Sequence, residues 1–88
     1  MAWKYETVNY ASTDHQFAKA VTATSGKKIK AGGFWLGRAS TSSTDSEVWI
    51  NTNGPSTDTN GDGTQWSVQG YYPNPSGDWS LTVYVFEE

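Results

Sequence analysis

The segment from residue 65 to residue 86, QWSVQGYYPNPSGDWSLTVYVF, constrains the fold more than any other part of the chain. Two runs within it, residues 65–72 and 79–85, alternate between apolar and polar side chains. Such alternation is typical of half-buried β-strands, because successive side chains point to opposite faces. The Pro-Asn-Pro-Ser-Gly segment between the runs indicates a turn, since proline cannot donate to the ladder of a strand. The sequence therefore predicts a β-hairpin.

The predicted hairpin has one register that turns both apolar faces to the same core. A loop of residues 73–76 sets Gly70 opposite Trp79, where a glycine leaves room for the indole ring. A loop one residue shorter or longer would set the apolar face of one strand against the polar face of the other. The expected cross-strand pairs are Trp66 with Val83, Val68 with Leu81, and Gly70 with Trp79.

Six segments of the chain are predicted as strands, which indicates an all-β fold. Short strands at close spacing, with no convincing helix between them, predict about six antiparallel strands in a small β-sandwich or barrel. Residues 52–64 are expected to form the longest irregular segment. A chain of 88 residues is expected to be one domain, residues 1–88. Besides the two strands of the hairpin, the predicted strands are residues 3–10, 16–24, 28–36 and 47–51.

The segments 16–24 and 28–36 are expected to pair as a second hairpin. In this arrangement Phe17 and Trp35 would lie opposite each other on the core side of the sheet. The glycine pair at residues 32–33 would weaken a strand, so it indicates a bulge or a neighbour packed close to the backbone.

Composition narrows the classes of function. The chain has no cysteine, which excludes disulfides and thiol chemistry. It has five Trp, five Tyr and three Phe. His15 is its only histidine and is expected to be solvated, and there is no G-x-S-x-G nucleophile motif. A non-catalytic protein is therefore predicted. The net charge of −3 argues against binding to nucleic acid.

The sequence shows no segment suited to a membrane. Its start, MAWKYETVNY, contains no apolar signal core, and no apolar run approaches the length of a membrane span. We therefore expect a soluble protein without membrane insertion. It would be cytoplasmic, or released or assembled at a surface.

Three short motifs resemble a known group of domains. They are AVTATSGKKIKAGGFW, DGTQWSV and WSLTVYVF, and they cover about the C-terminal three-quarters of the chain. The pattern GKK, three residues, GGF and a final LTVY strand is similar to a small all-β domain of bacterial secreted and phage-tail-like proteins. That group usually carries two cysteines, where this chain has Ser25 and Phe86. The resemblance implies a β fold and an extracytoplasmic or surface-adhesion setting.

The segment 58–64, DTNGDGT, matches the first half of a calcium-binding loop. Oxygen-bearing side chains fall at alternate positions, so that they can converge on one cation, and Gly63 would permit the sharp turn. Gln69 stands where such loops carry a bidentate glutamate. The alternative is a polar turn between two strands. The candidate calcium ligands are Asp58, Asn60, Asp62 and Thr64.

One predicted sheet face combines exposed aromatic rings with polar side chains. Val48 and Ile50 are expected to face the core, which turns Trp49 outward. An aromatic ring suits the C–H face of a sugar, and the polar groups around it suit the hydroxyls. The same surface would suit a contact between protein subunits. The candidate ligand-binding residues are Trp49, Glu47, Asn51, Tyr71, Gln69 and Tyr84.

These features lead to three hypotheses. The first is a lectin-like carbohydrate-binding module whose partner is a glycan, in a monomer or a homo-oligomer. The second is a structural or adhesive subunit of a surface or virion assembly that self-associates through the same face. The third is a small β toxin that binds a cell surface.

Overall fold

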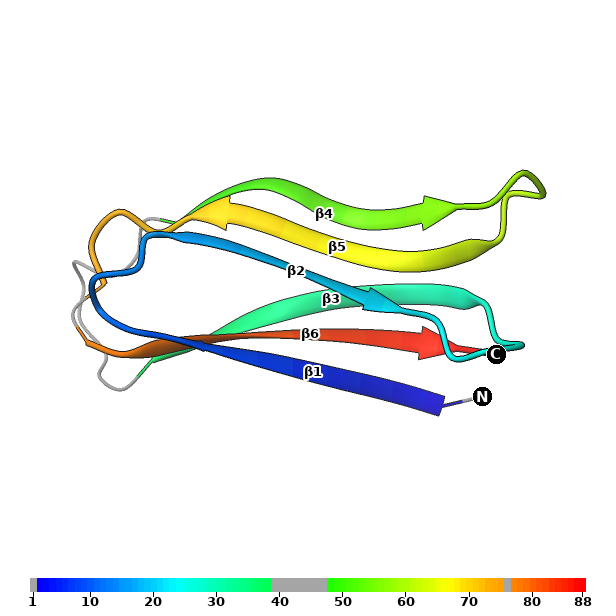
Figure 1. Ribbon diagram of the computed structural model, residues 1–88, viewed down its shortest axis with the longest axis horizontal. Helices are drawn as coiled ribbons and strands as arrows, with labels where there is room; N and C mark the ends of the chain where they lie inside the picture. The colour runs from blue at the N-terminus through cyan, green and yellow to red at the C-terminus, as the bar shows by residue number, and fades with distance from the viewer. Residues whose placement is uncertain (1, 39–47, 76) are drawn as a thin grey trace.

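The part of the chain that the structure describes forms six β-strands, which confirms the predicted all-β class (Figure 1). The computed structural model describes residues 2–38, 48–75 and 77–88, and those residues include no helix. The strands are β1 (Ala2–Tyr10), β2 (Gln16–Thr22), β3 (Ile29–Arg38), β4 (Trp49–Thr57), β5 (Gly63–Tyr71) and β6 (Trp79–Glu87).

The strands form one antiparallel sheet that curls into a half-barrel. Its order is β1-β6-β3-β5-β2, and β4 pairs with β5 on the side away from that path. The sheet has two halves, β1-β6-β3 and β2-β5-β4, which face each other in Figure 1. The halves join where Ile29 of β3 pairs with Gly63 of β5. A Cβ on Gly63 would overlap the carbonyl oxygen of Ile29, so glycine permits the close approach at this corner.

Both predicted hairpins are wrong. Strand β5 pairs with β2 and β4, whereas β6 pairs with β1 and β3. Val68 therefore lies opposite Lys19, and Gly70 lies opposite Phe17 instead of Trp79. Two strands that face each other across a core need the same apolar pattern as two strands paired side by side. The alternation thus identified the buried faces and not the partners.

Strand β4 is longer than predicted. It continues through residues 52–57, which the sequence suggested would be irregular, because their polar composition hides the period of a strand. Along this length β4 pairs with β5, its neighbour in sequence, and the register shifts between Ile50 and Thr52. Pro55 is tolerated in β4 because β4 is an edge strand, where a backbone without an N–H donor need not break the ladder.

The core lies between the two halves and is strongly aromatic at one end. Trp79 is 3% exposed, and its ring stacks on Tyr10 with centroids 4.4 Å apart. Phe17 and Tyr72 meet the same indole edge-on, at 5.7 and 5.0 Å. The predicted core faces of β2 and β6 are confirmed, and the remaining buried apolar residues are Val21, Ile29, Val68, Leu81, Val83 and Val85.

Side chains bridge the open side of the half-barrel between β1 and β2. The Lys4 ammonium donates a hydrogen bond to the Thr22 carbonyl oxygen at 2.8 Å. Lys19 and Glu6 form a salt bridge with 3.0 Å between nitrogen and oxygen. These contacts cover the backbone edges at the two ends of the sheet path, where unpaired strands would otherwise invite association.

Glu87 fastens the end of β6 to the turn after β2, and this contact predicts a pH dependence of stability. The Thr24 hydroxyl and backbone N–H donate to the two carboxylate oxygens, at 2.6 and 2.9 Å. These hydrogen bonds, helped by Lys4 and Lys27, lower the pKa of Glu87 from its ordinary 4.5, although burial acts in the opposite sense. A carboxylate with a lowered folded-state pKa stabilises the protein above its unfolded-state pKa. The contribution disappears as pH falls through the folded-state pKa.

We therefore expect Glu87→Gln to be less stable than the wild type at pH 7 and closer to it at about pH 3. Urea unfolding at the two pH values measures the difference, and Glu88→Gln controls for loss of a charge at an exposed neighbour. An equal destabilisation at both pH values would show that the ionised form of Glu87 has no special role.

Candidate functional site

Trp49 and Tyr71 form an exposed aromatic pair at one end of the β2-β5-β4 half. Trp49 lies directly opposite Tyr71 of β5, and their ring centroids are 5.8 Å apart. The Trp49 side chain is 63% exposed, so its predicted outward direction is confirmed. Val48 packs against the core as expected, but the prediction for Ile50 is wrong, because its side chain is 40% exposed and is not part of the core.

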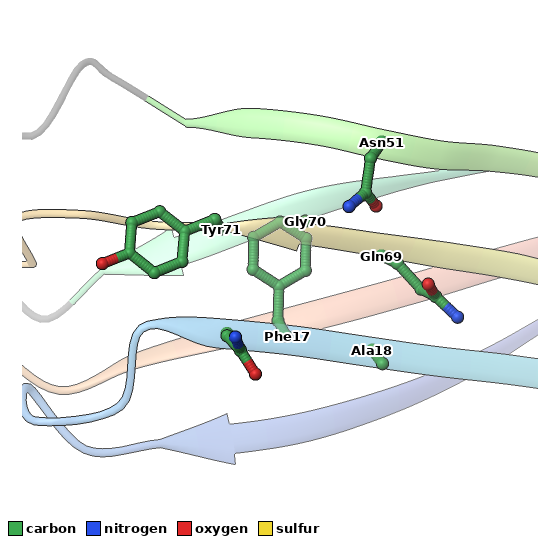
Figure 2. A pocket seen from close by; sticks show the side chains of 7 residues that line it. Phe17, Ala18, Asn51, Gln69, Gly70 and Tyr71 are labelled. Atoms are coloured by element: carbon green, nitrogen blue, oxygen red, sulfur yellow. The ribbon is translucent and has the colours of Figure 1, made fainter.

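A hollow of about 410 Å³ is lined by Tyr71 of this pair and by two further predicted ligand residues, Asn51 and Gln69, whereas Trp49 does not line it (Figure 2). The β4 register shift leaves Asn51 as an extra residue between Ile50 and Thr52, and such a bulge re-aims a side chain. Figure 2 shows the Asn51 amide directed from β4 towards β5. The rest of the lining comes from Gln16, Phe17, Ala18 and Gly70.

A second hollow, of about 550 Å³, lies on the other side of Tyr71 and shares Tyr71 and Gln16 with the first. His15 lines it, with its ring 6.0 Å from that of Tyr71 and its Nδ1 3.1 Å from the Tyr72 carbonyl oxygen. Asp14 also lines it and accepts a hydrogen bond from the Ala11 backbone N–H at 2.9 Å.

Sequence reasoning missed His15 and Gln16 as site residues. Gln16 reaches the site because it lies opposite Tyr71 in the pairing of β2 with β5. No local signal marks that pairing, since the two strands are distant in sequence.

Two predicted ligand residues do not join this site in the structure. Tyr84 belongs to β6, in the other half of the sheet, and lies between Tyr5 of β1 and Gly33 of β3. Its predicted place beside Tyr71 depended on the hairpin of β5 and β6, which does not form. Glu47 lies outside the described residues.

The predicted calcium loop is a tight turn between β4 and β5. Asp58 Oδ1 accepts hydrogen bonds from the backbone N–H groups of Asn60 and Asp62, at 2.8 and 3.0 Å. Asp62 forms a salt bridge with Lys28 at 3.1 Å. Gly61, with φ of 81°, takes the left-handed conformation in this turn, whereas Gly63, at which the sharp turn was predicted, is the first residue of β5. Both carboxylates thus have partners within the protein, and calcium binding by Asp58, Asn60, Asp62 and Thr64 stays a prediction.

A larger aromatic surface covers the outside of the other half, and we call it the outer aromatic face. Three of its rings are about half exposed: Trp3 52%, Tyr5 58% and Trp35 49%. Tyr84 is at its centre, with ring centroids 5.7 Å from Trp3 and 5.5 Å from Trp35. The face consists of Trp3 and Tyr5 of β1, Trp35 of β3, and Tyr84 and Phe86 of β6.

Trp35 was predicted to face the core, and this prediction is wrong. The register between β3 and β6 shifts between Ile29 and Ala31, so residues after the bulge point to the side opposite from the one expected. Gly33 is therefore outward too, and a Cβ there would overlap the Tyr84 ring. Gly32 lies under the Trp66 ring in the same way, which confirms that the glycine pair marks closely packed neighbours.

Comparison with known proteins shows no matching family model, curated protein or solved structure. Within the described residues, no helix is long and apolar enough to cross a membrane. Function must therefore be inferred from two groups of side chains, those around Trp49 and Tyr71 and those of the outer aromatic face.

Proposed function

We propose that the protein is a non-catalytic carbohydrate-binding module whose site is the hollow beside Trp49 and Tyr71. The observation that carries the proposal is the exposed Trp–Tyr pair next to the amides of Asn51 and Gln69. A pyranose ring has an apolar C–H face that can stack on an aromatic ring. Its hydroxyls need both donors and acceptors, and a side-chain amide supplies both.

The dimensions of the site support a ligand longer than one sugar unit. The first hollow, of about 410 Å³, is within the size range of small-molecule sites. The second hollow continues past Tyr71 to Asp14 and His15. Two adjacent units of an oligosaccharide can therefore lie on either side of the Tyr71 ring.

The lining of the two hollows favours binding over hydrolysis. Most glycosidases need a pair of carboxyl groups flanking the scissile bond. Among the described residues of the two hollows only Asp14 carries a carboxylate, and it is hydrogen-bonded to the Ala11 N–H. We therefore propose no reaction at this site.

Trp49→Ala is expected to weaken glycan binding at least tenfold, because the substitution removes the largest exposed ring of the platform. The free energy of unfolding should change by less than about 1 kcal/mol, because the side chain is mostly in solvent. A glycan array would first identify the sugar, and isothermal titration calorimetry would then compare the variants. Trp35→Ala is the matched control, since it removes an exposed indole from the outer aromatic face.

Two outcomes would contradict the proposal. Binding that survives in Trp49→Ala would place the sugar elsewhere on the molecule. An array without any hit, followed by no heat of binding at millimolar sugar, would argue against a carbohydrate ligand.

A second candidate function, a self-associating structural or adhesive subunit, is favoured by the outer aromatic face. Exposed clusters of aromatic side chains are characteristic of protein interfaces. The observed cluster lies on β1, β6 and β3, and it shares only Tyr84 with the face that was predicted from the sequence.

A further inference from the structure

We infer that two copies of this chain associate in solution through the outer aromatic face. The inference concerns a different half of the sheet from the proposed sugar site, and it does not depend on that proposal. The sequence prediction placed self-association on a face that combined Trp49, Tyr71 and Tyr84, and of these only Tyr84 belongs to the outer aromatic face.

The side chains of this face suit a protein partner better than a sugar. The cross-strand rows that contain the five rings hold no charged residue and no side-chain amide. The two threonine hydroxyls in those rows, of Thr7 and Thr82, are hydrogen-bonded to each other at 2.9 Å. The sugar site, in contrast, has Asn51 and Gln69 beside its rings. An uncharged aromatic centre is the composition that distinguishes the core of a protein interface.

The exposed area is large enough for the centre of an interface. Aromatic side chains bury about 150–250 Å² each when fully covered. Trp3, Tyr5 and Trp35 are each about half exposed, so together they leave about 200–400 Å² uncovered. A standard interface uses about 800 Å² on each partner. The rings thus provide about a quarter to a half of it, with the neighbouring polar residues as the rim.

The rings are held in place before any partner arrives, which reduces the entropy lost on association. Tyr84 lies over Gly33, where any larger residue would displace it. Trp35 contacts both Tyr84 and Tyr5, with centroids 5.5 and 6.1 Å apart. Side chains that are both aromatic and ordered are the usual energetic centres of interfaces.

The absence of charged residues from the cross-strand rows of this face allows a second copy as the occupant. The chain has a net charge of −3, so two copies repel each other at long range and are expected to meet where each presents no charge. A patch that contacts the same patch on another copy gives a closed twofold dimer. Two twisted sheets can pack face to face in this way, about 10 Å apart.

The dimer would leave the proposed sugar site accessible. The outer aromatic face lies on the β1-β6-β3 half, whereas Trp49 and Tyr71 lie on the β2-β5-β4 half. Each dimer would then present two sites, and a ligand that reaches both would bind more tightly than either site alone allows.

Sedimentation velocity of the full chain, from about 1 μM to about 1 mM, tests the inference. The wild type is expected to move from monomer to dimer over this range, and the dimer is expected to strengthen with added salt, which screens the repulsion between like charges. Trp35→Ser and Tyr5→Ser should each raise the dissociation constant at least tenfold. Trp49→Ser, at a ring that is at least as exposed, should leave it unchanged.

Circular dichroism and thermal melts establish whether each variant is folded. If Trp35→Ser does not fold, Tyr5→Ser on the edge strand β1 tests the same face. A wild type that stays monomeric to about 1 mM would overturn the inference, as would association lost in Trp49→Ser and retained in the other two variants. Loss of binding to a sugar too short to bridge two sites, by folded, monomeric Trp35→Ser, would show that this face itself holds the carbohydrate, and would also overturn the inference.

Discussion

Replacing Trp79 with alanine is expected to lower the free energy of unfolding by about 3–5 kcal/mol, far more than the loss of any exposed ring. The side chain is 3% exposed and contacts three aromatic rings, so its removal opens a cavity at the aromatic end of the core. Its indole N–H also donates to the Ala11 carbonyl oxygen at 3.1 Å, and that acceptor would keep only the hydrogen bond from the Asp14 backbone N–H. Urea unfolding followed by circular dichroism measures the change.

Trp79→Phe provides a second, milder measurement, which is useful because a small domain has a thin core and little stability to lose. This variant retains an aromatic ring and loses only the hydrogen bond and part of the volume, so its stability is expected to lie between those of the wild type and the alanine variant. Trp49→Ala serves as the exposed control. Equal unfolding midpoints for the Trp79 and Trp49 alanine variants would contradict the burial of Trp79 in the core.

Gly70→Ala is expected to destabilise the protein by about 1–3 kcal/mol, although alanine is normally better than glycine within a strand. A Cβ at this position would overlap the Trp49 carbonyl oxygen and would lie 2.5 Å from the Phe17 ring. The carbonyl belongs to the paired backbone of β4 and cannot move without disturbing the ladder. The reason for a glycine here is therefore Phe17 and β4, and not Trp79 as the predicted hairpin required.

Gly54→Ala is the matched control for this substitution. Gly54 lies on β4 and pairs with Ser67 of β5, and a Cβ added there would meet no atom within 4 Å beyond its chain neighbours. The control should be neutral or slightly stabilising, because alanine restricts the unfolded chain more than glycine does. Similar unfolding midpoints for the two variants would show that Gly70 is not closely packed.

The candidate sugar site was only partly predictable, for a reason visible in its residues. Trp49 was found because Val48, its apolar neighbour, packs against the core and alternation turns the next side chain outward. Asn51 joins Tyr71 through a bulge and through the pairing of β4 with β5. His15 and Gln16 come from the far side of β5, and nothing in their own sequence indicates that neighbour.

The sequence by itself determined that the chain is all β and which face of β2, β5 and β6 is buried. The apolar alternation at Phe17 and Val21, and again at Leu81, Val83 and Val85, is a local property of an extended backbone, so it can be recognised without knowing the partner strand.

Only the tertiary structure decided which strands pair and therefore which outer residues meet. A core between two sheet halves accepts the same alternation as a hairpin does, so the pattern cannot distinguish β5 beside β6 from β5 facing β6. The bulge in β3 reversed the direction of Trp35, and the position of β6 between β1 and β3 moved Tyr84 to the outer aromatic face. Pairing between distant strands depends on how the whole chain closes around its core, and no short segment carries that information.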